Sequence, residues 1–242
     1  MKDSRNSKTC IHCNNCPIQE ICIAAAMPDS EVYKFNEIVE HPKALQKSET
    51  LFYAGESLTY LYAIRKGSVK TFNISQDGEE QITGFHRAGE LIGIDALARK
   101  RHNSFAKVLE ETEVCAIPYD KLDALASKVP ELHTQMMNIL SEEIAKQYEL
   151  MLTLNQRAAD QRLASFLLNM YKRGNDSGSE SISLNMTRGE IGNYLGLALE
   201  TVSRLFSKFK QQNLIELDRR EVKVINFPKL QQVAGIEQKM AA

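Results

Sequence analysis

The sequence has no excess of charge of either sign, no long apolar run and few cysteines. Lys and Arg number 30 against 31 Asp and Glu, a formal net charge of -1. This balance excludes the polycationic binding of histone-like proteins but not a locally basic module. No apolar run approaches the roughly 18 residues of a transmembrane helix, so no membrane span is expected. Residues 1–8 are polar and lack an apolar segment, so the sequence predicts a cytoplasmic protein.

The composition is that of an ordinary globular protein. Of the 242 residues, 43% are hydrophobic and 25% are charged. A chain of this length can form one large or two modest domains and bury a core without disulfides.

Four of the five cysteines lie within thirteen residues, as Cys10, Cys13, Cys16 and Cys22 in the pattern C-x2-C-x2-C-x5-C. The fifth, Cys115, lies far away in a segment with strand character. The odd count and the missing signal peptide argue against disulfides. Closely spaced thiolates chelate soft metals, so an iron–sulfur cluster, a structural zinc and a redox dithiol are the alternatives.

The spacing alone does not choose the metal or the ligand set. No second C-x2-C follows to close a zinc knuckle, and no thioredoxin-like βαβ pattern follows Cys22. His12 is more simply a surface histidine than a ligand. Cys115 could equally be a small buried hydrophobe, since the other four cysteines could close a site without it.

Beyond a helix expected over residues 29–41, the pattern is that of an antiparallel barrel or sandwich. Glycines recur every 11 or 12 residues at positions 55, 67, 78 and 89, with Asp77-Gly78 as the clearest hairpin tip. Short β-branched and aromatic runs at 51–53, 60–64, 69–72 and 81–85 lie between them. The barrel is expected to end near Pro118.

A long helix is predicted over residues 131–155. Apolar residues at alternating spacings of three and four indicate a coiled-coil seam and hence a homodimer. The alternative is that the helix packs on its own domain. Its apolar stripe is wide enough for this packing and for dimerisation. A polar residue at one seam position would weaken the pairing. The predicted seam is Met137, Leu140, Ile144, Gln147, Met151 and Leu154.

The C-terminal part predicts a winged helix-turn-helix. Thr187 to Glu190 forms a capping box, Gly196 gives the turn, and a second helix follows over 198–211. Its polar face has the chemistry of major-groove readout, although a solvated face with an ion pair would have the same spacing. A hairpin with a basic turn at 218–220 follows as the wing. The face consists of Glu200, Ser203, Arg204, Ser207 and Lys208, and the wing's basic residues are Arg219, Arg220 and Lys223.

With a barrel, a seam helix and a winged helix-turn-helix in this order, the chain resembles the cyclic-AMP-receptor/FNR superfamily of bacterial transcription factors, most closely its oxygen-sensing branch. The resemblance covers nearly the whole chain and rests on the cysteine set and on residues 81–86, 187–196 and 200–204. It implies an α+β fold with a cupin-like antiparallel β-roll. The expected parts are a cluster-binding segment at 1–28, the β-roll at 29–130, the dimerisation helix at 131–157 and the DNA-binding domain at 158–242.

The resemblance also implies a ligand set and a target. An oxygen-labile [4Fe-4S] cluster would be bound by Cys13, Cys16, Cys22 and Cys115, with Cys10 spare, although Cys10 could exchange with Cys13. Glu200, Ser203 and Arg204 would contact bases of an inverted repeat of TTGAT-like half-sites. RNA polymerase would contact the hairpin tip at 77–80. The expected contacts to the DNA backbone are Thr187, Arg188, Lys208, Arg219 and Arg220.

The cyclic-nucleotide branch of this superfamily uses a Gly-Glu segment, an acidic ribose contact and an Arg-Ser-Ala that holds the phosphate. Here Gly89-Glu90 is kept, Ile94 stands at the acidic position, and Asn103 to Ala106 replace the Arg-Ser-Ala. Without the arginine a phosphate loses its charge-assisted partner, so no cyclic nucleotide is expected. The prediction is a transcription regulator, not an enzyme, whose cluster controls dimerisation and DNA binding. The alternative is a zinc-stapled regulator with no oxygen response.

Overall fold

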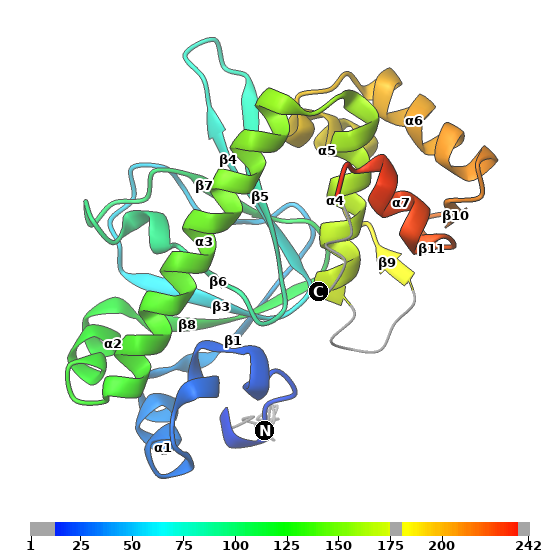
Figure 1. Ribbon diagram of the computed structural model, residues 1–242. Coiled ribbons are helices and arrows are strands. Elements are labelled where there is room, and N and C mark those ends of the chain that lie inside the picture. The colour runs from blue at the N-terminus through cyan, green and yellow to red at the C-terminus, as the bar shows by residue number, and fades with distance from the viewer. Residues whose placement is uncertain (1–12, 175–180, 237–242) are drawn as a thin grey trace, which may run out of the picture. The chain divides into compact units, whose positions relative to one another are not determined.

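The computed structural model describes residues 13–174 and 181–236, so Cys10 and His12 lie outside the described residues (Figure 1). The chain divides into two compact units, one ending at Ile144 and the other beginning at Ala145. The long helix α3 (Pro130–Gln156) contributes to both units. Among the described residues no helix is long and apolar enough to cross a membrane.

The first unit is built on two antiparallel sheets of four strands each, with strand orders β1-β8-β3-β6 and β2-β7-β4-β5. The α+β class with an antiparallel sensor domain is therefore confirmed. The strands are β1 (Glu40–Leu45), β2 (Thr50–Phe52), β3 (Tyr60–Lys66), β4 (Ser68–Ile74), β5 (Glu80–Arg87), β6 (Leu91–Ile92), β7 (Phe105–Val108) and β8 (Thr112–Pro118).

The predicted N-terminal helix is shorter than expected. The helix α1 (Asp29–Ile38) ends at Ile38, and strand β1 begins at Glu40, which pairs with Ala116 of β8. Pro42 disfavours helical backbone at the residue before it, which explains why the helix cannot run to His41. The helix α2 (Tyr119–Ala126) was not predicted.

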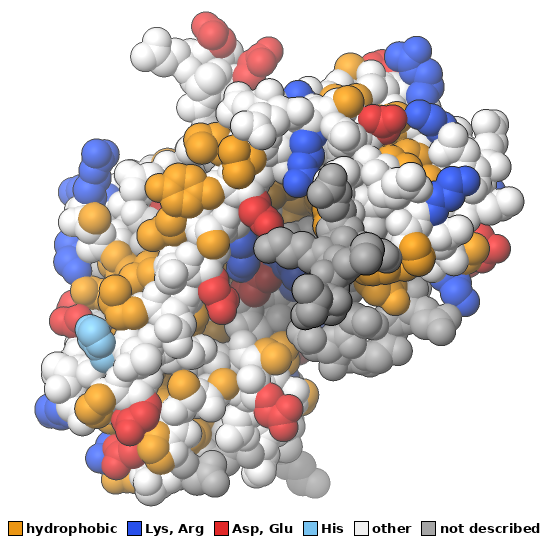
Figure 2. Space-filling view, viewed as in Figure 1, with side chains coloured by type: hydrophobic (Ala, Val, Ile, Leu, Met, Phe, Trp, Pro, Cys, Tyr) orange, Lys and Arg blue, Asp and Glu red, His pale blue; other side chains and the backbone are white. Residues whose placement is uncertain are grey.

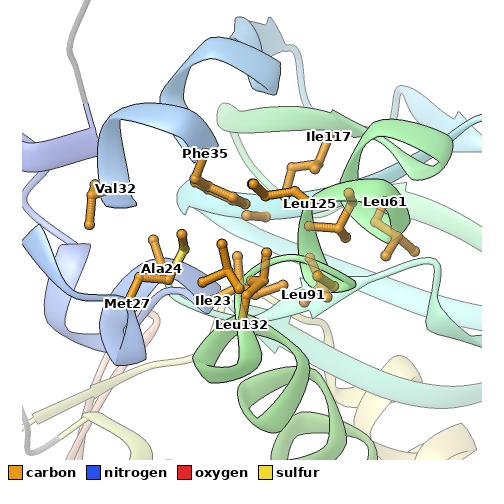
Figure 3. Close-up of a cluster of buried hydrophobic side chains, with 14 residues drawn as sticks. Ile23, Ala24, Met27, Val32, Phe35, Leu61, Leu91, Ile117, Leu125 and Leu132 are labelled. Atoms are coloured by element: carbon orange, nitrogen blue, oxygen red, sulfur yellow. The ribbon is translucent and has the colours of Figure 1, made fainter. Parts of the chain in front are cut away.

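The N-terminal segment folds onto the barrel through a shared apolar core. It forms the 3-10 turns η1 (Cys13–Asn15), η2 (Gln19–Ile21) and η3 (Ile23–Ala26) before α1 begins. Figure 3 shows the side chains of Ile23, Ala24 and Met27, in and just after η3, meeting those of the barrel and of α3. Burial of this apolar surface holds the N-terminal segment, α1, the barrel, α2 and the start of α3 together. The core contains Ile23, Ala24, Met27, Val32, Phe35, Leu61, Ala63, Leu91, Ile117, Leu122, Leu125, Ala126, Val129 and Leu132.

The second unit is a winged helix-turn-helix, as predicted. The end of α3 leads into α4 (Ala159–Gly174), and α5 (Arg188–Leu195) and α6 (Leu199–Gln211) form the helix-turn-helix. The wing is a sheet of three antiparallel strands in the order β10-β11-β9, of which β9 was not predicted. These strands are β9 (Ser181–Ser183), β10 (Ile215–Asp218) and β11 (Glu221–Val224), and α7 (Phe227–Val233) follows.

Candidate cysteine site and nucleic-acid interface

The structure brings four of the five cysteines together. Cys13 begins η1, Cys16 follows that turn, Cys22 separates η2 from η3, and Cys115 lies on β8 opposite Ala63 of β3. The other three thiols are near enough to Cys115 for their charge to act on its pKa. As they stand, no three His, Cys, Asp or Glu side chains in the described ranges form a group that could hold a metal ion.

Burial governs the chemistry of these thiols. It raises the pKa of Cys13 to about 11, and the charges of Cys22 and Cys16 add to the rise. It raises the pKa of Cys115 to about 12, helped by the other three thiols and opposed by the Arg65 guanidinium. Burial also raises the pKa of Cys22, although neighbouring backbone N–H groups oppose the shift. At neutral pH these thiols therefore keep their protons, and a metal that binds them must displace those protons.

The donor set therefore fits a thiolate-bound metal centre. It consists of soft sulfur ligands, which suit an iron–sulfur cluster or zinc. Cys13, Cys22 and Cys115 pack against the apolar core, which limits the access of water. Arg65, which forms an ion pair with Glu113 at 2.6 Å, supplies a positive charge that sequence reasoning missed. Its place near Cys115 follows from the pairing of β3 with β8, which no local sequence pattern indicates.

Two contacts fix the N-terminal segment around the thiols. The backbone N–H of Cys13 donates to Asn36 Oδ1 of α1 at 3.0 Å. A Cβ placed on Gly89 would lie 2.7 Å from Cδ1 of Ile21, the residue before Cys22. Gly89 also has φ +93°, so both its backbone and its close approach require glycine. Sequence reasoning predicted the turn at Gly89 but not the contact.

A second polar group joins Asp95 to residues 102–104, in the stretch that the resemblance matches to the Arg-Ser-Ala of the cyclic-nucleotide branch. Asp95 Oδ2 accepts hydrogen bonds from the backbone N–H of Asn103 at 2.8 Å, and from the N–H and Oγ of Ser104 at 3.0 and 2.9 Å. His102 Nδ1 lies 3.4 Å from Oδ1, and its ring stacks on Phe52. Burial alone would raise the pKa of Asp95, but these hydrogen bonds lower it below its usual value. The donors of this loop are thus already satisfied by a carboxylate.

The predicted base-reading side chains share the exposed face of α6. Glu200, Ser203 and Arg204 are all exposed, and the opposite face packs through Val202, Phe206 and Phe209. Leu199 does not join this packed face: it is the first residue of the helix and is 49% exposed.

The start of α5 is capped as predicted. Thr187 Oγ1 accepts from the N–H of Glu190 at 3.1 Å, and the carboxylate of Glu190 accepts from the N–H of Thr187 at 2.8 Å. The Arg188 guanidinium stacks 3.1 Å from the centroid of the Phe206 ring. Burial lowers its pKa to about 10 and leaves Nη1 with no hydrogen-bond partner among the described residues.

The other predicted backbone contacts differ in their surroundings. Lys208 Nζ lies 3.3 Å from Asp160 Oδ2 of α4, so it already has an acidic partner. Arg219 and Arg220 are exposed at the turn between β10 and β11, and Arg219 has φ +51°. The wing therefore presents two guanidinium groups to solvent.

The predicted seam follows one side of α3. Met137, Ile144 and Met151 are 53%, 56% and 50% exposed, and Gln147 is exposed between them. Leu140 and Leu154 are partly buried. Figure 2 shows apolar side chains gathered along the visible surface of this helix. A run of exposed large apolar side chains on one helix indicates an association surface.

Comparison with known proteins agrees with this arrangement. The Crp-like helix-turn-helix domain matches residues 161–233, and the cyclic nucleotide-binding domain matches residues 42–129. FixK2 from Bradyrhizobium japonicum has a TM-score of 0.76 at 27% identity and covers 81% of this chain and 97% of its own. A CRP-family regulator from Thermus thermophilus shares the fold, with a TM-score of 0.67 at 20% identity, covering 82% and 100% of the two chains. Barrel, long helix and winged helix-turn-helix define a Crp-like transcription regulator.

Sequence relatives narrow this class. The fumarate and nitrate reduction regulatory protein of Vibrio cholerae is 42% identical over 228 residues, which cover 93% of this chain and 91% of the relative. The anaerobic regulatory protein of Aggregatibacter actinomycetemcomitans is 43% identical over 227 residues, covering 93% and 88%. The chain belongs to the CRP/FNR family of transcription regulators and is not an enzyme.

Proposed function

We propose that this protein is an anaerobic transcription regulator of the cytoplasm in which Cys13, Cys16, Cys22 and Cys115 hold an oxygen-labile [4Fe-4S] cluster. The names of its relatives and the convergence of four partly buried thiols support the proposal. When bound, the cluster would supply bonds between iron and the four thiolates that oxygen can break. A regulator stapled by zinc, with no oxygen response, would use the same thiols.

A shared apolar core is the observation that carries the proposal. Cys13, Cys22 and Cys115 pack against the same core as Leu132, Met136 and Ile139 of α3. The packing of the first turns of α3 therefore depends on how the N-terminal segment is held. Because packed cores shift between discrete arrangements, releasing this segment would alter α3 where the seam begins. The segment at 1–28, the β-roll at 29–130, the helix at 131–157 and the domain at 158–242 are the proposed working parts.

Dimerisation is proposed to occur through Met137, Leu140, Ile144, Gln147, Met151 and Leu154. Exposed apolar residues favour pairing of two α3 helices, and Gln147 weakens it. If monomer and dimer are close in free energy, a ligand that binds the dimer more tightly by a few kcal/mol shifts the equilibrium between them. Two paired recognition helices would then meet major grooves about 34 Å apart.

On DNA, Glu200, Ser203 and Arg204 are proposed to read bases of TTGAT-like half-sites in an inverted repeat. Thr187, Arg188, Lys208, Arg219 and Arg220 are proposed to contact phosphates. Arg188, at the first position of α5, is only partly exposed, so the Thr187 N-terminus of this helix and the exposed Arg219 and Arg220 are the contacts that phosphates reach most directly. Lys208 would exchange Asp160 for a phosphate.

No cyclic nucleotide is proposed to bind the barrel. The carboxylate of Asp95 occupies the N–H and hydroxyl donors of Asn103 and Ser104, so a phosphate would meet a negative charge there. RNA polymerase is proposed to contact the tip of the β4–β5 hairpin at residues 77–80, which is largely exposed.

Anaerobic purification with iron, sulfide and zinc analysis tests the metal. We expect about four iron and four sulfide per chain, together with a brown colour that fades in air. Cys115→Ser should abolish iron retention, whereas Cys10→Ser should keep it. A colourless protein with one zinc per chain would contradict the cluster and support the zinc-stapled alternative.

A further inference from the structure

In the second unit, the guanidinium of Arg162 donates hydrogen bonds to backbone carbonyls of three segments. Arg162, on the first turn of α4, donates through Nη2 to Leu154 O at 2.7 Å and through Nε to Arg157 O at 2.9 Å. Its Nη1 donates to Leu195 O at 3.0 Å and lies 3.5 Å from Gly196 O. The end of α3, the α3–α4 connection and the turn of the helix-turn-helix thus meet on one side chain.

The acceptors are groups that helix geometry leaves unsatisfied. Leu154 lies in the last turn of α3, and Leu195 is the last residue of α5. Carbonyls at helix C-termini lack partners within the helix and carry a partial negative charge. A guanidinium presents five donors in a rigid plane, so it can bond to several of them at once. A lysine ammonium at this position cannot span both helix ends with fixed geometry.

The turn between the two DNA-binding helices is shaped to admit this side chain. Gly196 has φ +62°, and a Cβ there would lie 3.3 Å from Arg162 Nη1 and 3.7 Å from Leu154 Cδ2. Sequence reasoning assigned Gly196 to the turn alone. Its lack of a side chain also allows the end of α3 and the guanidinium to approach.

We propose that Arg162 is a positioning residue that transmits the direction of the seam helix to the recognition helix. The inference rests on the proposed dimeric DNA-binding function. The N–H of Leu197 donates to Gly192 O at 2.8 Å, and α6 begins two residues later, so the turn held by Arg162 sets where α6 starts. In a dimer paired through α3, this clamp fixes the separation and angle of the two α6 helices, and hence the spacing of half-sites that the protein accepts.

Amide hydrogen exchange on the full-length protein tests the clamp without DNA. Arg162→Lys keeps the positive charge but loses the planar set of guanidinium N–H donors. Arg157→Lys is the matched control, because the Arg157 side chain bonds to Ser165 of α4. We expect faster exchange in Arg162→Lys both at residues 150–156 and at 195–200, and wild-type exchange in the control. Faster exchange confined to residues 157–165 would overturn the proposal.

DNA binding tests whether Arg162 sets the half-site spacing that the protein accepts. With duplexes carrying TTGAT inverted repeats, we expect Arg162→Lys to bind the preferred spacing about tenfold more weakly, because the two recognition helices are no longer held at one separation. We also expect it to discriminate less against repeats one base pair longer or shorter, with unchanged binding to a single half-site and an unchanged dimer mass. Equal losses on the repeat and the half-site, or undiminished spacing discrimination, would overturn it. Failure of the wild type to bind any repeat would refute the proposed function, while the exchange experiment would still decide on the clamp.

Discussion

The backbone N–H of Cys13 is bonded to the side-chain oxygen of Asn36 at 3.0 Å, which ties the first proposed ligand to helix α1. The Val32 and Phe35 side chains of this helix lie in the core that the thiols also contact. The position of the sulfur therefore depends on a helix that itself binds no metal. Such supporting contacts around ligands commonly tune the stability of a metal centre.

We predict that Asn36→Ala weakens cluster retention without unfolding the barrel. The loss of one partly buried hydrogen bond costs roughly 0.5–1.5 kcal/mol. Iron content after anaerobic dialysis against a chelator should fall faster than in the wild type, while the urea midpoint of the iron-free protein changes little. Identical rates of iron loss would show that the Cys13 backbone needs no support from Asn36.

Gly89→Ala should be markedly more harmful than Gly78→Ala. Both glycines have positive φ, +93° and +81°, so both alanines carry a similar backbone strain of roughly 1–2 kcal/mol. Only at Gly89 would the new Cβ meet another side chain, Ile21, whereas nothing lies within 4 Å at Gly78. We expect a further loss of about 1–3 kcal/mol at Gly89, measured by urea unfolding. Equal losses of stability in the two variants would mean that the segment around Ile21 moves away from the new Cβ at no cost in free energy.

The acid stability of the first unit should depend on Asp95. Its pKa is lower in the folded chain than in the unfolded chain, so its contribution is present above the unfolded pKa of about 3.9 and is lost as pH falls through the folded pKa. Asp95→Asn should therefore be less stable at pH 7 and should lose less stability than the wild type on acidification below about pH 4. Asp77→Asn, at the exposed hairpin tip, is the control. Parallel pH profiles of urea unfolding for Asp95→Asn and the wild type would contradict this role.

Arg204→Ala and Arg219→Ala should affect DNA binding differently. Arg204 is proposed to read a base, so its loss should cost about 1–3 kcal/mol on the preferred site and relax sequence preference there. Arg219 is proposed to contact phosphate, so its loss should weaken binding to all sequences alike and lower the salt dependence. Titrations at several salt concentrations on specific and scrambled duplexes separate the two effects. A uniform loss in Arg204→Ala would make it a backbone contact.

Much of the fold could be predicted because local patterns determine it. The strands of the β4–β5 hairpin, the length of α3 and the capping box at Thr187 all follow from periodicity and turn chemistry within short stretches of sequence. Strand β1 was missed because its pairing with β8 involves residues far away in sequence, and its own apolar content is low.

The resemblance names four thiols as ligands, which stays a proposal, and the sequence does not show what surrounds them. Asn36, Arg65 and Ile21 come near these thiols only after the chain folds. Likewise, the sequence shows that no arginine stands where the resemblance expects the Arg-Ser-Ala, but not that Asp95 accepts hydrogen bonds from the donors of this loop. Arg162 lies on a helix with no recognisable motif, and its partners are backbone carbonyls, which leave no trace in residue type.

We propose that the state of the four thiols controls pairing of α3 and thereby DNA binding. Analytical ultracentrifugation of anaerobically purified protein, repeated on the same sample after exposure to air, measures this dependence. We expect a species with the mass of two chains that falls to the mass of one as iron is lost, with parallel loss of binding to the inverted repeat. A mass that stays the same before and after air, while iron is lost, would contradict it.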